Sequence, residues 1–561
     1  MRWAVGLVLL AMLAQAQEKP AAMSALKADR TAFTFTRYQL DVKIDDARMG
    51  FSARGTVTLR NDSKAPQPVI ALQITSSLKW AAIRQGESSL KFVSTSIPHD
   101  ADHTGAVSEA VATLAEPVQP GGVVELEIGY QGTIEQDATR LTRLGMPGEL
   151  ARRTDWDGIS AEFTAIRGVG HVLWFPVALE PALLGDGNKL FRELGEWRQR
   201  NANAVFRVTY ADHPGKMLIA NGERKSAVEN VYQMDRMGLE GPFFLIGDYS
   251  TVDTANGRVF YLKENEASAR ALGTVLAKLE PAASNGQKSA VQIVELPARW
   301  ASHESGPTLL TAFGAAPEKE LQQQLIHTLT HGSFYSARPW IYEGVAHLAQ
   351  VTQREEQGNR RAALDYLEQR RPALALAEPD SALANDAQQS LVNSSDEIMY
   401  RTKAMFVWWM LRDILTPPVL KKALGEYRPE LDKEPAYIQR LLETACGKQL
   451  EWFFSDWVYR DRGLPEFEVA SVYPRQTLKG SYLVTVTIEN KGGAGAEVPV
   501  RVRMKDGEVS ARMVVRAREK ATARIESAQM PIEVIVNDGS VPETDPSNNT
   551  FMVKTGTASP Q

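Results

Sequence analysis

Two histidines and a glutamate have the spacing of metal ligands. His327 and His331 are four residues apart, and eleven residues separate His331 from Glu343. On a helix, side chains at the first of these spacings lie on one face one turn apart, so both imidazoles can reach one tetrahedral ion. A carboxylate from a second helix is the usual third ligand. The sequence therefore predicts a zinc site held by His327, His331 and Glu343.

The residue after the first histidine determines what such a metal could do. An open zinc site holds a water molecule and needs a nearby carboxylate to accept its proton, normally from the position directly after that histidine. Thr328 occupies the position, and a threonine cannot act as a base at neutral pH. The pattern thus predicts metal ligands without the usual general base.

The segment from His327 to Ala346 resembles the gluzincin zinc metallopeptidases of the membrane alanyl aminopeptidase family. Their signature is H-E-x-x-H followed by a ligand glutamate in an N-E-G-F-A-like segment, which Glu343-Gly-Val-Ala346 matches. Two features depart from the family: Thr328 replaces the general-base glutamate, and the connection from His331 to Glu343 is shorter. The chain is therefore similar to a divergent member of the family.

Two further residues take their expected roles from this resemblance. Tyr400 and Ala404 are in register with the family's Y-x-K-G-A helix, which implies that Tyr400 hydrogen-bonds the transition-state oxyanion. Glu304 stands where the family has G-x-M-E-N, which implies that it binds the free amino terminus of a peptide. Glu304 is also the candidate for a substitute base. The resemblance extends from about residue 35 to 465 and includes Trp174-Phe-Pro176 and the segment from Trp452 to Pro465.

Each of these residues also has a structural interpretation. His347, one turn beyond Glu343, is a fourth metal ligand, a hydrogen-bond partner of a ligand, or a surface histidine. Tyr400 lies in an apolar helical segment, where a tyrosine is commonly a core residue with a satisfied hydroxyl. Glu304 could simply be solvated. In a decayed site, His327 and His331 would be hydrogen-bonded interior residues.

Composition limits the class of protein. The 561 residues exceed what one hydrophobic core serves, and 43% hydrophobic with 23% charged residues is typical of globular domains. A net charge of -5 gives no sign of the basic surface that nucleic-acid binding needs, so the sequence disfavours that class of function. Cys446 is the single cysteine, which excludes an intrachain disulfide.

The amino terminus has the pattern of a secretory signal. Met1-Arg2 precedes an apolar run from Trp3 to Leu13 and the sequence Ala14-Gln15-Ala16, which predicts cleavage after Ala16 and export to the periplasm or the medium. The run is shorter than the ~20 residues that span a bilayer, and no later run is long enough, so we expect no membrane span.

Hydrophobic periodicity predicts a multidomain α+β protein. Alternation at Tyr38, Leu40, Val42 and Ile44 is typical of β-strands, a helical pattern follows Gly257, and alternation returns after residue 466 with about seven strands. The predicted units are a signal peptide (1–16), an N-terminal antiparallel β domain (24–257), a thermolysin-like mixed catalytic-type domain (258–463), a C-terminal immunoglobulin-like β-sandwich (466–555) and a tail (556–561).

Three hypotheses of function follow. The first is an exported zinc metallopeptidase-like protein that hydrolyses peptide N-termini weakly or not at all, because Thr328 replaces the base. The alternative is a non-catalytic descendant that binds a peptide or protein. The third is a β-rich scaffold with no site, which predicts that the histidines lie far from Glu343. Substrate preference and oligomeric state are not encoded in any motif of the chain.

Overall fold

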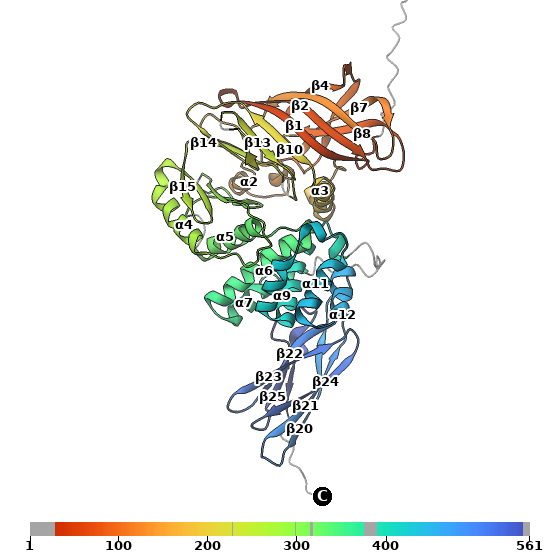
Figure 1. Ribbon diagram of the computed structural model, residues 1–561, viewed down its shortest axis with the longest axis vertical. Helices are drawn as coiled ribbons and strands as arrows, with labels where there is room; N and C mark the ends of the chain where they lie inside the picture. The colour runs from red at the N-terminus through yellow and green to blue at the C-terminus, as the bar shows by residue number, and fades with distance from the viewer. Residues whose placement is uncertain are drawn as a thin grey trace, which may run out of the picture.

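A computed structural model describes residues 28–553, except 227, 240, 298, 315–317 and 375–389. A β-rich unit, a mixed unit and a second β unit follow one another along an elongated molecule (Figure 1). The predicted multidomain α+β fold with several β-sheets is thereby confirmed. The predicted signal peptide (1–16) and tail (556–561) lie outside the described residues. No helix in the described part of the chain is both long and apolar enough to cross a membrane.

The N-terminal unit contains an eight-stranded sheet, in the order β12-β13-β10-β1-β2-β8-β4-β5, and the three-stranded sheets β3-β7-β6 and β11-β14-β9. Its elements are β1 (Phe33–Asp45), β2 (Gly50–Asn61), β3 (Gln67–Thr75), β4 (Leu78–Gln85), β5 (Ser88–Ser89), β6 (Phe92–Pro98), β7 (Ala106–Val118), β8 (Val123–Thr133), α1 (Thr139–Thr142), α2 (Gly148–Thr154), β9 (Thr164–Ile166), α3 (Gly187–Asn201), β10 (Val205–Tyr210), β11 (Met217–Ala220), β12 (Glu223–Arg224), β13 (Asn230–Met234) and β14 (Phe244–Gly247).

Strand β1 shows why the alternation predicted strands but not their direction. Tyr38, Leu40 and Val42 are buried, and the residues between them are exposed. However, β1 pairs with β10 in parallel, whereas its pairing with β2 is antiparallel. Side chains alternate with a period of two in both kinds of strand, so the pattern cannot distinguish them.

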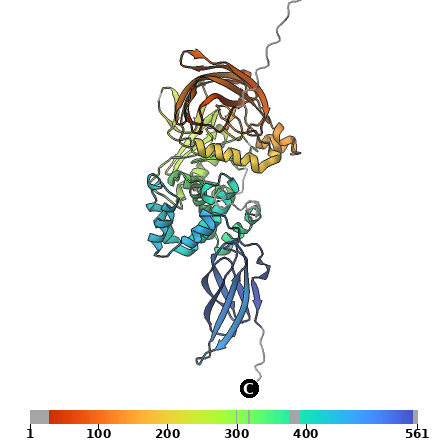
Figure 2. The same cartoon turned by 90° about the vertical axis from the view of Figure 1, so that its right-hand side faces the viewer.

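Helix α3 runs along the lower edge of this unit, next to the second unit (Figure 2). A Cβ atom at Gly195 would lie 1.9 Å from the carbonyl oxygen of Ser395, so only glycine permits this approach. The Gln199 amide donates a hydrogen bond of 2.7 Å to the carbonyl oxygen of Ser394. These contacts fix the N-terminal unit against the segment that leads to Tyr400.

The second unit is built on a five-stranded sheet in the order β15-β16-β17-β19-β18. Its elements are β15 (Tyr249–Thr254), β16 (Gly257–Leu262), α4 (Glu266–Lys278), β17 (Val291–Glu295), β18 (His303–Ser305), β19 (Thr308–Thr311), α5 (Glu318–Ser333), α6 (Pro339–Gln357), α7 (Arg360–Glu368), α8 (Arg371–Leu374), the π-helical turn η5 (Ile398–Lys403), α9 (Ala404–Leu415), α10 (Pro417–Glu426), α11 (Ala436–Cys446) and α12 (Glu451–Phe454). Strand β15 forms a hairpin with β16, so this sheet begins before residue 258. The alternation of apolar and polar residues continues through that hairpin, so it does not mark the boundary between the first two units.

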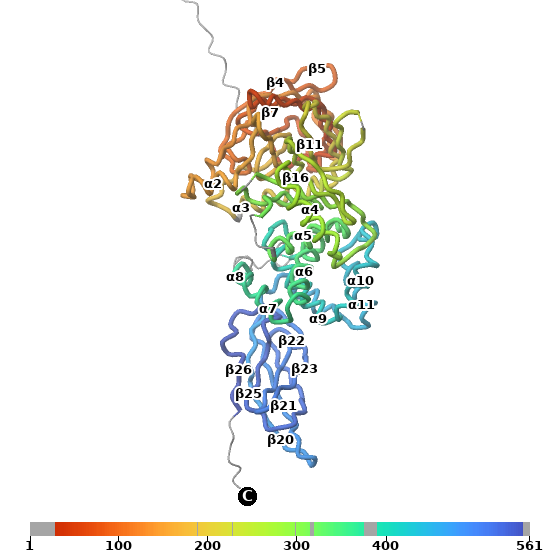
Figure 3. The backbone as a smooth tube through the Cα atoms, turned by 90° about the vertical axis from the view of Figure 1, so that its left-hand side faces the viewer, coloured from red at the N-terminus to blue at the C-terminus, as the bar shows by residue number. Residues whose placement is uncertain are grey.

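Helices α5 and α6 position the predicted ligands, and they lie side by side (Figures 1 and 3). Leu325 and Leu329 on α5 pack against the sheet, together with Val291 and Leu309. This orientation turns His327 and His331, on the other face of α5, towards α6. Only residues 334–338 separate the two helices, and Pro339 suits the first position of α6 because its missing N–H is not needed there.

Gly344, next to the predicted ligand Glu343, allows α6 to approach α9. A Cβ atom there would lie 2.6 Å from Cδ1 of Trp408 and 2.8 Å from Cβ of Ala404. We expect Gly344→Ala to lower the free energy of unfolding, because overpacking costs about 1–3 kcal/mol and outweighs a helix-propensity gain of up to about 1 kcal/mol. Chemical denaturation measures the change. The control is Gly185→Ala, where a Cβ meets nothing within 4 Å; equal stability of both variants would contradict the prediction.

The C-terminal unit consists of the sheets β20-β21-β24 and β23-β22-β25-β26. Its strands are β20 (Phe467–Gln476), β21 (Tyr482–Asn490), β22 (Ala496–Arg503), β23 (Glu508–Val515), β24 (Lys520–Ser527), β25 (Glu533–Val536) and β26 (Thr550–Met552). The indole N–H of Trp457 donates to the carbonyl oxygen of Gly495 at 2.7 Å and links this unit to the second one. The immunoglobulin-like topology stays a prediction.

Candidate metal centre

The structure brings His327, His331 and Glu343 together between α5 and α6. Nε2 of His327 lies 3.8 Å from Oε2 of Glu343, and Nε2 of His331 lies 3.6 Å from its Oε1. The centroids of the two imidazole rings are 4.6 Å apart. All three residues are at most 5% exposed. This proximity contradicts the scaffold hypothesis, which placed the histidines far from Glu343.

Two groups of potential ligand atoms share His327. One comprises Glu304, His327 and His331, and the other comprises His327, Glu343 and His347, with all atoms of a group within 4.8 Å of one another. The three predicted ligands are therefore divided between the two groups: His331 belongs to the first, Glu343 belongs to the second, and His327 belongs to both. His347 joins the second group because it lies one helical turn after Glu343 on the same face of α6.

Five buried polar atoms of these side chains lack hydrogen-bond partners among the described residues. They are Nε2 of His327, Nδ1 and Nε2 of His331, Nε2 of His347 and Oε2 of Glu343. A buried polar atom without a partner costs about 1–3 kcal/mol, so several of them facing one another need a common partner. Imidazole nitrogens and a carboxylate are ligands that Zn²⁺ accepts. The residues present therefore fit a zinc ion.

Burial controls the protonation of the histidines. It lowers the pKa of His331 and of His347 well below the ordinary value. Burial also disfavours the charged form of His327, but the neighbouring carboxylates of Glu304 and Glu343 outweigh it and raise the pKa of His327. Neutral imidazoles at His331 and His347 are in the form that binds metals.

Glu304, on β18, contacts the metal-binding helix directly. Its Oε1 lies 2.7 Å from Nδ1 of His327 and accepts a hydrogen bond of 2.6 Å from the hydroxyl of Thr328. Burial raises the pKa of Glu304, but the charge of His327 more than compensates and leaves the pKa below its usual value. Glu304 thus holds the ring nitrogen of His327 that faces away from Glu343. The sequence did not indicate this contact, because β18 and α5 meet only in the folded chain.

Thr328 is fully buried, and the single proton of its hydroxyl is shared between two acceptors. Besides the bond to Glu304, its hydroxyl lies 2.9 Å from the carbonyl oxygen of Gln324, one turn earlier in α5. A hydroxyl carries one proton and can rotate it towards either acceptor. A neutral hydroxyl is too weakly basic to accept a proton at neutral pH.

Tyr400 lies near the predicted ligands, on the π-helical turn η5. Its hydroxyl hydrogen-bonds Glu397, which also accepts a bond of 2.7 Å from Arg198 of α3. Burial raises the pKa of Tyr400 strongly, so the phenol stays protonated. Arg401, the next residue, places its Nε 3.3 Å from Oε2 of Glu343. Arg198, Glu397 and Arg401 were not predicted as site residues. The available signal was the pair of opposite charges, Glu397 and Arg401, on either side of Tyr400.

A cavity of about 280 Å³ lies between the N-terminal and second units, next to the candidate ligands. Ligand sites are commonly found between domains and measure about 300–1,000 Å³, so this cavity is at the small end of that range. Its walls carry charges of both signs. They are formed by Gly168, Val169, His171, Arg198, Leu239, Gly241, Ser302, His303, Glu304, His327, Glu343, Glu397, Tyr400 and Arg401.

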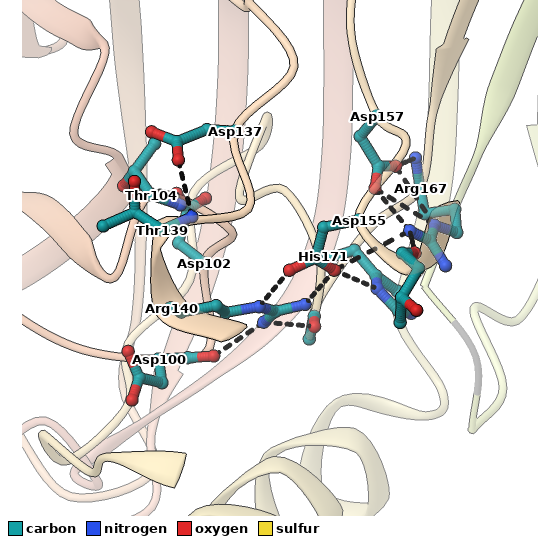
Figure 4. A network of polar contacts seen from close by, with 12 residues as sticks. Asp100, Asp102, Thr104, Asp137, Thr139, Arg140, Asp155, Asp157, Arg167 and His171 are labelled. Carbon is teal, nitrogen blue, oxygen red and sulfur yellow. Dashed lines mark hydrogen bonds and ion pairs between the residues drawn. The ribbon is translucent and has the colours of Figure 1, made fainter. Parts of the chain in front are cut away.

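A buried network of ion pairs lies behind His171 (Figure 4). Asp155 accepts two hydrogen bonds from Arg140, at 2.7 and 2.8 Å. Asp157 accepts one of 2.6 Å from Nη2 of Arg167. Asp155, Asp157 and His171 have the spacing of metal ligands, but both carboxylates already bind guanidinium groups. We interpret this network as a support for the cavity wall.

No protein-family model matches the sequence, and no curated protein matches it. The structure is similar to that of the M1 zinc metallopeptidase from Deinococcus radiodurans, with 15% identity, a TM-score of 0.46, and coverage of 75% of this chain and 92% of that one. It is also similar to a mutant of that enzyme bound to a Tyr-ser-ala substrate, with 16% identity, a TM-score of 0.46, and coverage of 78% and 96%. The structural neighbours are thus M1 zinc metallopeptidases at low sequence identity.

Proposed function

We propose that this chain is an exported, zinc-binding, metallopeptidase-like protein that holds the amino-terminal part of a peptide in the cavity and hydrolyses it weakly or not at all. The observation that carries the proposal is the convergence of unpartnered Nε2 atoms of His327 and His331 on the carboxylate of Glu343. Unpartnered acceptors of this kind favour a metal ion. Export is inferred from the signal-like residues 1–16.

The low activity follows from the surroundings of Thr328. Bound zinc would act as a Lewis acid and lower the pKa of a bound water to about 7. The carboxylate that usually accepts the proton is replaced by a hydroxyl that already contacts Glu304 at 2.6 Å. Oε1 of Glu304 is engaged with both Thr328 and His327. We therefore assign Glu304 chiefly to orienting His327, and less to proton transfer.

The other cavity residues provide for binding and orientation. Tyr400, whose phenol stays protonated, can donate a hydrogen bond to a substrate carbonyl oxygen once it turns away from Glu397. We propose that Glu304 binds the amino group of a peptide through Oε2, the carboxylate oxygen that does not contact His327 or Thr328. Arg198 and Glu397 hold the two units together beside the cavity.

The proposal is tested by elemental analysis of the purified protein together with an aminoacyl-amide assay. We expect about one zinc per chain and turnover far below the ordinary ~10 per second. His327→Ala should lose the metal, and His213→Ala, a histidine outside both ligand groups, should retain it. Absence of zinc from the native protein after reconstitution would overturn the metal site. Ordinary turnover would overturn the role of Thr328 as a lost base.

Tyr400→Phe examines the proposed oxyanion contact. Removing one such donor lowers the rate about 10²–10³-fold, so any residual hydrolysis by the zinc-loaded protein should fall by that factor. Zinc content should not change, because Tyr400 belongs to neither ligand group. The measurement compares the initial rates and metal content of the two proteins, and equal rates would make Tyr400 a core residue.

The alternative function is a peptide-binding protein without catalysis. It is favoured by the engagement of Thr328 and Glu304 with each other, which leaves the hydroxyl and Oε1 already hydrogen-bonded. Calorimetric titration with short peptides distinguishes the two functions. Binding of intact peptides without products in the mixture would support the alternative, and appearance of free amino acids would support the peptidase.

A further inference from the structure

We propose that His347 is a fourth protein ligand of the metal, so that His327, His331, Glu343 and His347 close its coordination sphere. The inference rests on the proposed metal site and specifies its type. Structural zinc sites have four protein ligands, whereas catalytic ones have three and keep a position for water. A closed site would hold no metal-bound water, so within the proposed function it favours the absence of hydrolysis and makes a base at position 328 dispensable.

The arrangement of the helices produces two matching pairs of ligands. His327 and His331 are four residues apart on α5, and Glu343 and His347 are four residues apart on α6. Each pair therefore occupies one face of its helix, and the two helices pack against each other. Nε2 of His347 lies 3.9 Å from Oε2 of Glu343, the same oxygen that lies 3.8 Å from Nε2 of His327.

The hydrogen bonds around Gln350 fix the tautomer of His347. The amide nitrogen of Gln350 donates to the carbonyl oxygen of Gln323 at 3.0 Å, so its Oε1 is the atom that faces Nδ1 of His347, also at 3.0 Å. That oxygen accepts a further bond of 2.9 Å from the hydroxyl of Tyr366. An amide oxygen only accepts, so Nδ1 of His347 carries the proton. Nε2 then has a lone pair.

This lone pair faces the metal site and has no donor. Nε2 of His347 is buried and lacks a hydrogen-bond partner in the described part of the chain, and the ring centroid of His347 lies 4.6 Å from that of His327. Hydrogen bonding of the far ring nitrogen is how proteins orient metal-binding histidines. His327 has the same arrangement, with Glu304 at its Nδ1. A surface histidine would need neither feature.

X-ray absorption spectroscopy of the zinc-loaded full-length protein tests the proposal without a variant. We expect three imidazoles and one carboxylate oxygen, with bond lengths of about 2.0–2.2 Å. A spectrum with two imidazoles and additional oxygen would overturn the proposal, while the zinc site of the proposed function would stand. Failure to bind zinc at all would overturn both.

The cobalt-substituted protein gives a second readout, and titration with azide reports an open position. We expect azide to leave the visible spectrum of the native protein unchanged and to shift that of His347→Ala, in which a position becomes free. Zinc affinity of His347→Ala, measured by competition with a chelator, should fall at least ~100-fold, the upper end of the loss seen for residues that only support a ligand.

Two further variants keep the result interpretable. His347→Gln retains most of the side-chain volume and should behave as His347→Ala does, which covers the case in which the alanine variant does not fold. His213→Ala should bind zinc and ignore azide as the native protein does. An azide response of the native protein equal to that of His347→Ala would show that His347 is not a ligand.

Discussion

Thr328→Glu combined with His347→Ala should hydrolyse aminoacyl substrates about 10²–10⁴-fold faster than His347→Ala alone. His347→Ala opens a coordination position for water, and Thr328→Glu supplies a carboxylate that can accept the proton of that water. General-base catalysis of this kind typically raises a rate by about 10²–10⁴-fold. The new carboxylate would lie beside Glu304, because the Thr328 hydroxyl is 2.6 Å from it. Repulsion between like charges raises its pKa towards the neutral range in which general bases are efficient. Initial rates of zinc-loaded proteins give the comparison.

The single variants separate the contributions of the two positions. Thr328→Glu alone should gain much less than the double variant, since His347 would still occupy the metal. Thr328→Gln with His347→Ala is the matched control, with similar volume and no base. If Thr328→Glu alone reached the rate of the double variant, His347 would not be a ligand. If the double variant equalled its control, the site would lack more than a base.

Asp157→Asn should lower the free energy of unfolding by about 3–5 kcal/mol, the usual cost of removing one partner of a buried ion pair. Asp157 is fully buried and also accepts a hydrogen bond of 2.6 Å from the backbone N–H of Arg167. The substitution would deprive the Arg167 guanidinium, 3.9 Å above the Trp156 ring, of its nearer carboxylate and leave only Asp155, at 4.0 Å. Urea denaturation at pH 7 measures the loss. Asp41→Asn, in an exposed pair with Arg54, should cost less than about 1 kcal/mol.

The effect of Asp157→Asn should depend on pH. Burial raises the pKa of Asp157, but Arg167 outweighs burial and lowers the pKa to about 2. A carboxyl group with a lowered pKa stabilises the fold fully above its unfolded-state pKa of about 3.9, and this contribution is lost as the pH falls through about 2. The difference between native protein and variant should therefore be constant at neutral pH and shrink in acid. A difference that grew in acid would contradict the ion-pair interpretation.

Local patterns were sufficient to predict several elements of this fold, but not helix α3 (Gly187–Asn201), which lies within the predicted β domain. The period-two alternation of β1 and the continuous apolar stretch of α9 each correspond to a strand or helix with the expected burial. Helix α5 also follows its pattern, with Leu325 and Leu329 against the sheet. Such patterns report which face of a strand or helix is buried, and they are the same for every element of that kind, whatever its neighbours. The patterns did not determine that β1 pairs in parallel with β10, or that β15 belongs to the sheet of the second unit.

The sequence by itself determined which chemical groups this protein has: His327, His331 and Glu343 at ligand spacing, and a threonine in place of a base at position 328. The tertiary structure decided what surrounds them. Only folding places Glu304 at Nδ1 of His327 and turns His347 towards Glu343. The reason is physical, because spacing within one helix fixes which side chains share a face, whereas contacts between β18, α5 and α6 depend on how whole elements pack.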